Sequence, residues 1–234
     1  MIRDPQAPNI VSTIGEFFDA GGLLMWPILG CSVVVVGLAI ERYVSLRRPR
    51  VVPAVVGAAV EQIVQGRADV VADGIVAAAA PAARVLAAGL RRRGFLVADV
   101  EKAMEDRLRD ETARLRGNVR GITLVAAVAP LLGLLGTVLG IADAFATVEQ
   151  SGLGRGDNSE ALAAGIKVAL YTTIFGLFVA IPATLIAAHL QALVRRRAAA
   201  IAETVAPAVE ALAQRPAGGA APPPASAQGA THAA

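Results

Sequence analysis

Three threonine hydroxyls interrupt two long apolar stretches of this 234-residue chain. Thr137 lies in the middle of one stretch, and Thr172 and Thr173 are adjacent in the other. A hydroxyl both donates and accepts hydrogen bonds, so it is a polar group that an apolar helix must accommodate. A single threonine in an apolar helix usually bonds only a carbonyl of its own helix. Three such hydroxyls at membrane depth make this explanation less sufficient than it is for one.

Two opposite charges, Asp143 and Lys167, occur in or beside the same stretches. If the two stretches are antiparallel helices with Thr137 and Thr173 level, Asp143 and Lys167 are also level. Each charge is then about 9 Å from its threonine, because a helix rises about 1.5 Å per residue. Unpaired charges at membrane depth are costly. We predict that the two side chains lie near one another, within a subunit or between neighbours; the alternative is that both reach the outer interface separately.

Small and helix-distorting residues surround Thr137. Gly133, Gly136 and Gly140 are spaced by three and four residues, so they share a helix face and allow a second helix to approach closely. Pro130 and Pro182 each remove a backbone donor and free a carbonyl, which kinks a helix and exposes polar backbone where a cavity is lined. Kinks without any further role are the alternative.

The composition is that of a membrane protein. Hydrophobic residues make up 55% of the chain, and the mean hydropathy is +0.58, which is more apolar than ordinary soluble domains. The single cysteine excludes an intrachain disulfide, and the spacing of His189 and His232 matches no metal site or catalytic pair. We therefore expect no catalytic residue, metal or other cofactor. The net charge of +3 does not favour nucleic acid as a partner.

Three segments are apolar and long enough to span a bilayer: residues 21–40, 122–148 and 166–194. Arginines gather after the first segment, before the second and after the third, and they are Arg42, Arg47, Arg48, Arg50, Arg114, Arg116, Arg120, Arg195, Arg196 and Arg197. Because cytoplasmic ends carry the excess of basic residues, the N-terminus is predicted to be periplasmic and the C-terminus cytoplasmic. The predicted fold is an all-α polytopic membrane protein with three transmembrane helices.

The remaining segments have distinct predicted roles. Residues 1–20 form an extracytoplasmic amphipathic segment, 41–121 a cytoplasmic helical domain, 149–165 a periplasmic loop, 195–214 a cytoplasmic helix and 215–234 a disordered tail. Within the helical domain, residues 54–94 are predicted to be helical with breaks near Gly66, Gly74 and Pro81. Residues 99–116 form a helix whose charged run is a solvated face, and which continues into the second span because no proline intervenes.

Three sequence motifs resemble the ExbB/TolQ branch of the MotA/TolQ/ExbB proton-channel family. They are "GGLLMWPILGCSVVVVGLAIERYVSLRR" in the first span, "APLLGLLGTVLGI" in the second and "GIKVALYTTIFGLFVAIPATL" in the third. The order of the helices and the large first loop on the cytoplasmic side are also similar to that branch. The resemblance covers roughly residues 21–197.

The resemblance implies a bacterial inner-membrane homopentamer around the single transmembrane helices of two ExbD/TolR-like partner chains. It implies that an aspartate of the partner carries the proton, and that Thr137 and Thr173 line its path, with Thr172 beside them. The family uses the proton-motive force to do work on transport, on the cell envelope or on motility. A TonB/TolA-like or motility transducer is therefore a further implied partner, beside the lipid bilayer.

One position departs from the family pattern. ExbB and TolQ carry a glutamate early in the third helix, and the ungapped match places Val168 there, next to Lys167. The role of that glutamate cannot be transferred, and Asp143, at an asparagine-like position of its motif, is a candidate to compensate. The departure leaves a non-conducting membrane scaffold of the same fold as the alternative function. It also leaves open whether the ion is H⁺ or Na⁺ and which process is powered.

Overall fold

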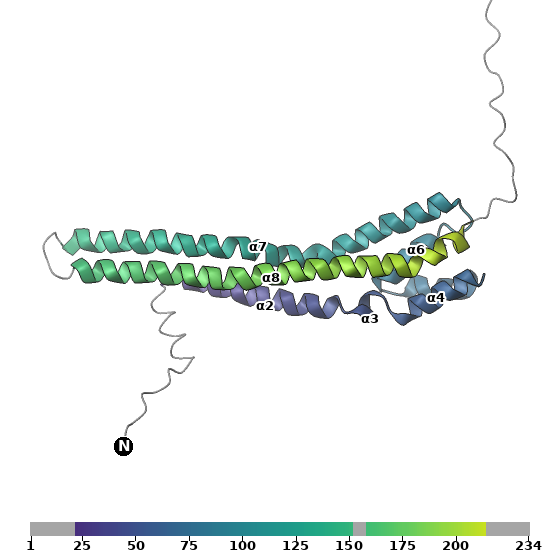
Figure 1. Cartoon of the computed structure of the whole chain (residues 1–234), viewed down its shortest axis with the longest axis horizontal. Coiled ribbons are helices and arrows are strands. Elements are labelled where there is room, and N and C mark those ends of the chain that lie inside the picture. Colours follow the sequence, from purple (N-terminus) through teal and green to yellow (C-terminus); the bar gives the residue numbers. More distant parts are fainter. Residues whose placement is uncertain (1–21, 152–157, 214–234) are drawn as a thin grey trace, which may run out of the picture. The chain divides into compact units, whose positions relative to one another are not determined.

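The computed structural model of the chain describes residues 22–151 and 158–213. Every regular element in these residues is an α-helix (Figure 1). In chain order they are α2 (Met25–Ser45), α3 (Arg48–Val51), α4 (Ala54–Val64), α5 (Ala68–Ala77), α6 (Pro81–Leu90), α7 (Val97–Ser151) and α8 (Asn158–Leu212). The predicted amphipathic segment 1–20 and the tail 215–234 lie outside the described residues.

The chain divides into two compact units. The membrane unit comprises the described residues of Met1–Arg48 and Thr112–Ala198, and the helical unit comprises those of Pro49–Glu111 and Ala199–Ala234. Helices α7 and α8 each contribute to both units. The boundary predicted for the loop at 149–165 was wrong, because α7 runs to Ser151 and α8 begins at Asn158. Both helices extend beyond the apolar residues from which the spans were predicted.

Three helices in the described residues are long and apolar enough to cross a membrane, namely α2, α7 and α8. This confirms the prediction of an all-α multi-pass membrane protein. Helix α7 is continuous from Val97 to Ser151, as expected from the absence of proline between residues 100 and 129. The proline that α7 does contain, Pro130, leaves the helix unbroken.

Much of the apolar surface of the membrane unit faces outwards. Exposed side chains on α7 and α8 include Leu131, Leu134, Val138, Leu170, Ile174, Phe178, Ile181 and Leu185. A single chain in water does not normally expose a continuous apolar surface of this kind. Lipid or further chains must therefore cover these faces.

Helix α2 is tied to the two longer helices at its C-terminal end. The guanidinium of Arg42 donates to the carbonyl of Leu115 at 3.3 Å, and the amide of Asn118 donates to the carboxylate of Glu41. The guanidinium of Arg197 donates to the carbonyl of Leu46 at 2.9 Å, directly after the helix ends. A cation at this position satisfies a terminal carbonyl and complements the helix dipole. Residues that the sequence marked only as topology signals thus also join helices.

Within the membrane unit, α7 and α8 approach each other closely enough for backbone contact (Figure 1). A Cβ atom built on Gly136 would lie 2.3 Å from the Thr172 hydroxyl oxygen, and one on Gly133 would lie 2.9 Å from the Thr172 carbonyl oxygen. A Cβ on Gly140 would lie 3.1 Å from the carbonyl oxygen of Gly165. These separations leave no room for a side chain, so the three glycines permit the contact.

Two glycines on α8 make the same kind of contact and were missed in the sequence. A Cβ on Gly165 would lie 2.3 Å from Cβ of Ala144, and one on Gly176 would lie 2.7 Å from the carbonyl oxygen of Ala129. The signal was present, because small residues recur at spacings of three and four along α8, namely Gly165, Ala169, Thr172, Gly176, Ala180, Ala183 and Ala187. This stripe is the counterpart of the glycine face on α7.

The helical unit contains α4, α5 and α6 together with the Val97–Glu111 part of α7 and the end of α8. Two of the three predicted breaks are present: Gly66 has a left-handed backbone with φ of 81° between α4 and α5, and Pro81 starts α6. The predicted break near Gly74 was wrong, because this residue lies inside α5. One glycine costs a helix only about 1 kcal/mol, which packing against neighbours can offset. The amide of Gly94 donates to the carbonyl of Leu212, which ties the chain entering α7 to the end of α8.

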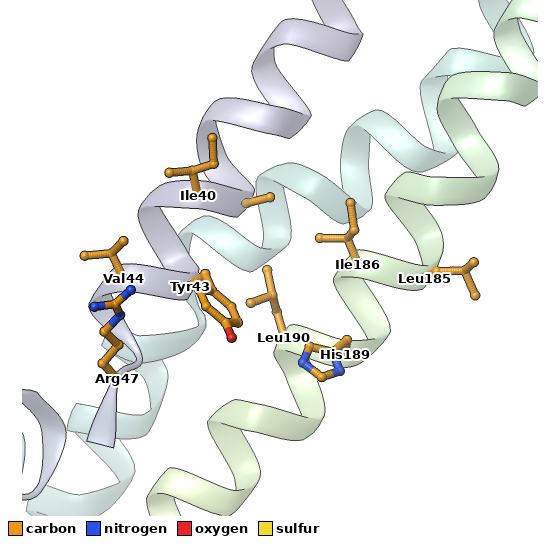
Figure 2. A pocket seen from close by; sticks show the side chains of 9 residues that line it. Ile40, Tyr43, Val44, Arg47, Leu185, Ile186, His189 and Leu190 are labelled. Atoms are coloured by element: carbon orange, nitrogen blue, oxygen red, sulfur yellow. The ribbon is translucent and has the colours of Figure 1, made fainter. Parts of the chain in front are cut away.

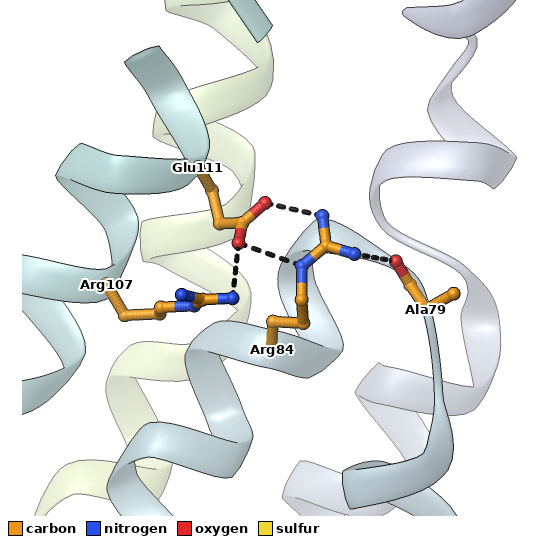
Figure 3. Close-up of polar contacts among 4 residues, drawn as sticks. All are labelled: Ala79, Arg84, Arg107 and Glu111. Atoms are coloured by element: carbon orange, nitrogen blue, oxygen red, sulfur yellow. Dashed lines mark hydrogen bonds and ion pairs between the residues drawn. The ribbon is translucent and has the colours of Figure 1, made fainter. Parts of the chain in front are cut away.

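The sequence predicted that the charged run of α7 is a solvated face. The structure shows that one residue of this run, Glu111, is not solvated. Glu111 is completely buried and binds Arg84 from α6 and Arg107 from its own helix (Figure 3). The Arg84 Nε donates to Glu111 Oε1 at 2.8 Å, and Arg107 reaches the same oxygen at 2.8 Å. Hydrogen bonding to this carboxylate raises the pKa of the Arg84 guanidinium. The spacing of Arg107 and Glu111 was visible in the sequence, whereas Arg84 is brought to them only by the tertiary fold.

Replacing Glu111 with alanine is expected to destabilise the helical unit by about 2 kcal/mol. The change leaves two arginines without their shared carboxylate, although their partial exposure to water limits the loss. The measurement is guanidinium unfolding of the full-length protein in detergent, followed by circular dichroism. The control is Glu105→Ala, which removes an exposed i,i+4 pair with Arg109 and should change stability by less than about 0.5 kcal/mol. Equal effects of the two variants would contradict a structural role for Glu111.

Replacing Gly136 with alanine is expected to weaken the packing of α7 against α8 by about 1–3 kcal/mol, the usual range for overpacking. The added methyl group would meet the Thr172 side chain, which is completely buried. The control is Gly37→Ala on α2, where nothing lies within 4 Å of the built Cβ. The thermal unfolding midpoint in detergent should fall for the first variant only. A fall of similar size for both would show that the contact is not tight.

Candidate functional site

The three threonines lie on the contact between α7 and α8, but they do not share one environment. Thr172 is completely buried against Gly136, and its hydroxyl donates within its own helix towards the carbonyls of Val168 and Ala169, at 3.2 and 3.0 Å. Its surroundings are closed to water and to another chain. Thr172 is therefore part of the packed contact between the two helices.

Thr173 is half-buried and is the one of the three whose hydroxyl reaches the opposite helix. Its Oγ1 lies 3.4 Å from the carbonyl oxygen of Gly133 on α7. Thr137 is also half-buried, and its Oγ1 donates to the carbonyl of Leu134 in its own helix at 2.7 Å. The bond of Thr173 is long and weak, so this hydroxyl is free to turn towards a better partner. Thr137 and Thr173 thus remain accessible on the flank of the α7–α8 contact.

The register of α7 and α8 follows from the positions that touch. Gly133 packs against Gly176, Gly136 against Thr172 and Gly140 against Ala169. This differs by only about one to two residues, or roughly 1.5–3 Å at 1.5 Å per residue, from the register with Thr137 and Thr173 level. The hydroxyls of Thr137 and Thr173 therefore occupy nearly the same depth in the membrane unit.

Asp143 and Lys167 are exposed, and within the described part of the chain no ion pair joins them. Lys167 instead lies over the ring of Tyr171, with its Nζ 5.8 Å from the ring centroid. Pairing inside one subunit, which was one form of the prediction, is absent. The form in which the charges pair between neighbouring subunits stays a prediction, because both side chains are exposed on this chain.

Pro130 and Pro182 lie inside continuous helices. Because proline has no N–H, the carbonyls of Ala126 and Phe178, four residues before, lack their usual helical donors. Pro182 is exposed on the membrane unit, and Pro130 is half-buried. Their effect on these helices is a local loss of backbone pairing, with both helices maintained.

Val168 occupies an apolar corner where three segments meet. A Cβ built on Gly140 would lie 3.5 Å from Val168 Cγ1, and one on Gly22, before α2, would lie 3.9 Å from the same atom. Gly22 has φ of 66°, a conformation that favours glycine. The position at which the resemblance places a glutamate is therefore occupied here by a half-buried apolar side chain near Gly140 and Gly22.

A separate apolar groove of about 630 Å³ lies between α2 and α8, away from the threonines. Figure 2 shows Tyr43 and His189 on the two sides of it, with Leu190 between them. Arg47 lies at the same end of α2 as the other basic residues. His189 lines this groove, whose lining includes none of the three threonines. Among the described residues, no group of His, Cys, Asp and Glu has the geometry to hold a metal ion.

Comparison with known proteins gives a consistent result. The model of the MotA/TolQ/ExbB proton channel family matches residues 77–203. The protein named ExbB-like 3 from Synechocystis sp. is 31% identical over 189 residues, which cover 79% of this chain and 88% of that protein. An ExbB homolog from Methanothermobacter thermautotrophicus is 32% identical over 77% of this chain and 63% of its own length.

A shorter match extends to the Tol branch. The Tol-Pal system protein TolQ of Pseudomonas aeruginosa is 37% identical over 89 residues, which cover 37% of this chain and 36% of that protein. The family match includes the glycine contacts between α7 and α8 and both accessible threonines. The relatives that align over most of this chain have ExbB-type names and belong to the biopolymer-transport type. This chain belongs to the MotA/TolQ/ExbB proton channel family, as a multi-pass membrane protein of the ExbB/TolQ branch.

Proposed function

We propose that this chain is the proton-channel subunit of an ExbB/TolQ-like inner-membrane motor. With an ExbD/TolR-like partner, it uses the proton-motive force to drive transport, envelope or motility work. The observation that carries the proposal is the pair Thr137 and Thr173, two accessible hydroxyls at nearly the same depth in a membrane unit of this family. The spans 122–148 and 166–194 contain no acidic residue at that depth. A titrating carboxyl group must therefore come from another chain.

The hydroxyls suit a proton carrier on a partner helix. Each threonine donates its hydrogen to a backbone carbonyl, which leaves its oxygen free to accept a hydrogen bond from a protonated carboxyl group. When the carboxyl group loses its proton, the hydroxyl can rotate and donate to the carboxylate, a charge-assisted bond that is stronger than the one it leaves. Thr173 has the smaller cost of rotation because its present bond is long. Thr172 is left out of the path because it is completely buried.

The proposed assembly is a homopentamer that encloses two copies of the single-span partner. The outward apolar faces of α7 and α8 support it, because they provide surface for neighbouring subunits, partner helices and lipid. In the proposed orientation of the chain, the arginine-rich ends of the spans lie in the cytoplasm. A TonB/TolA-like or motility transducer would receive the work at the periplasmic side.

A non-conducting scaffold is the second candidate, and Val168 favours it. This position is filled by apolar packing against Gly140 and Gly22 and offers no ionisable group to the path. The two candidates differ in one measurable quantity, the proton flux of the complex. Flux in the unmodified complex supports the channel, and its absence in an assembled complex supports the scaffold.

Replacing Thr137 and Thr173 together with valine is expected to lower proton flux by about tenfold to a hundredfold, the cost of about 1.5–3 kcal/mol for hydrogen bonds to a charged group. The assay is acidification of vesicles that contain the chain and its co-expressed partner, with a pH-sensitive dye. The matched control is Thr184→Val on α8, whose hydroxyl bonds only the carbonyl of Ala180 at 2.8 Å. Unchanged flux in the double variant, in a complex that conducts normally, would refute the threonine path.

A charge reversal tests whether Asp143 and Lys167 pair between neighbouring subunits. Asp143→Lys or Lys167→Asp alone places like charges together at the outer end of the spans and should reduce the amount of assembled oligomer. The combination of both changes should restore it, because the opposite charges meet again. Native gel electrophoresis of the purified protein measures the assembly. If the double variant assembles no better than either single variant, the two residues do not pair.

A further inference from the structure

A polar pocket of about 250 Å³ lies between α7 and α8 at the arginine-rich end of the membrane unit. Its lining consists of Arg116, Val119, Arg120, Thr123, Gln191 and Arg195. Arg116 and Arg120 come just before the apolar span of α7, and Arg195 comes just after that of α8. The pocket therefore lies at the boundary between the apolar and the polar parts of the membrane unit.

Three guanidinium groups line this one pocket, and no acidic residue is among its lining. Within the described residues none of the three arginines forms an ion pair. The topology rule explains why basic residues occur at this end of the spans. It does not explain why three of them, from two antiparallel helices, line the same cavity. Like charges around a shared cavity repel, so an anion in it would be stabilised by all three.

The neutral lining residues fit an anion with an apolar body. Thr123 donates to the carbonyl of Val119 at 3.1 Å, and both residues contribute apolar atoms to the lining. The side-chain amide of Gln191 supplies further N–H donors. Guanidinium groups bind phosphate through two parallel hydrogen bonds, and basic pockets between transmembrane helices at this level are suited to lipid head groups.

We propose that this pocket binds the phosphate of an anionic phospholipid from the adjacent leaflet. The phosphate accepts hydrogen bonds from Arg116, Arg120 and Arg195, and the acyl chains extend along the exposed apolar face of the spans. The position of the pocket at the boundary of the apolar spans favours a lipid over an acidic protein segment. A lipid phosphate occupies this boundary without leaving the bilayer. The site is independent of proton conduction by Thr137 and Thr173.

The test compares two lipids within each protein variant. Full-length protein purified in detergent is titrated with phosphatidylglycerol or with phosphatidylcholine, and retained lipid is counted by native mass spectrometry. Unmodified protein should prefer phosphatidylglycerol. Arg116→Gln, Arg120→Gln and Arg195→Gln should each reduce its affinity about tenfold, as expected for one lost charge-assisted contact. The two lipids are compared on the same variant. A general loss of stability would lower the binding of both lipids and would leave the preference between them unchanged.

The matched control is Arg196→Gln. Arg196 is adjacent to Arg195 and exposed, but it does not line the pocket. This variant should retain the unmodified preference for phosphatidylglycerol. An equal loss in the Arg196 variant would overturn the proposal in favour of diffuse attraction, as would equal binding of the two lipids by unmodified protein. Displacement of phosphatidylglycerol by a short polyglutamate peptide at similar concentration would assign the pocket to an acidic protein segment instead.

Discussion

The close approach of α7 and α8 is the constraint on which the rest of the membrane unit depends. In a bilayer the hydrophobic effect does not drive helices together, so association relies on packing and on polar contacts. Gly133 and Gly176 bring the two backbones together, and Gly136 makes room for the buried Thr172. A side chain at any of these glycines would separate the helices. The register of α7 and α8, and with it the depth of every polar group, follows from this contact.

Polar groups in the membrane unit fall into two kinds because of that contact. Those inside it, such as Thr172, have all their hydrogen-bonding needs met by the backbone of their own helix. Those on its flank, Thr137 and Thr173, keep part of their surface open. We propose that the open kind is available to a second chain. The same sequence element, a threonine in an apolar helix, thus has two different environments depending on the helix face.

The long helices were predictable from local signals. The apolar spans, the absence of proline before residue 129 and the arginines at the span ends are properties of short segments, and the structure contains α2, α7 and α8 as expected. The break near Gly74 was wrong because packing against α4 and α6 outweighs the weak helix propensity of one glycine. The solvated charge run was wrong at Glu111, because the sequence does not show which charged residue Arg84 will meet.

The sequence by itself determined the helices, the number of spans and the family, since these depend on composition, periodicity and motifs along short stretches. Only the tertiary structure decided which threonine is closed and which is open, and that three arginines from α7 and α8 line one pocket. The physical reason is that exposure and convergence depend on the rotation and register of one helix against another. These are decided by contacts between residues far apart in the chain, such as Gly133 with Gly176, which no local pattern specifies.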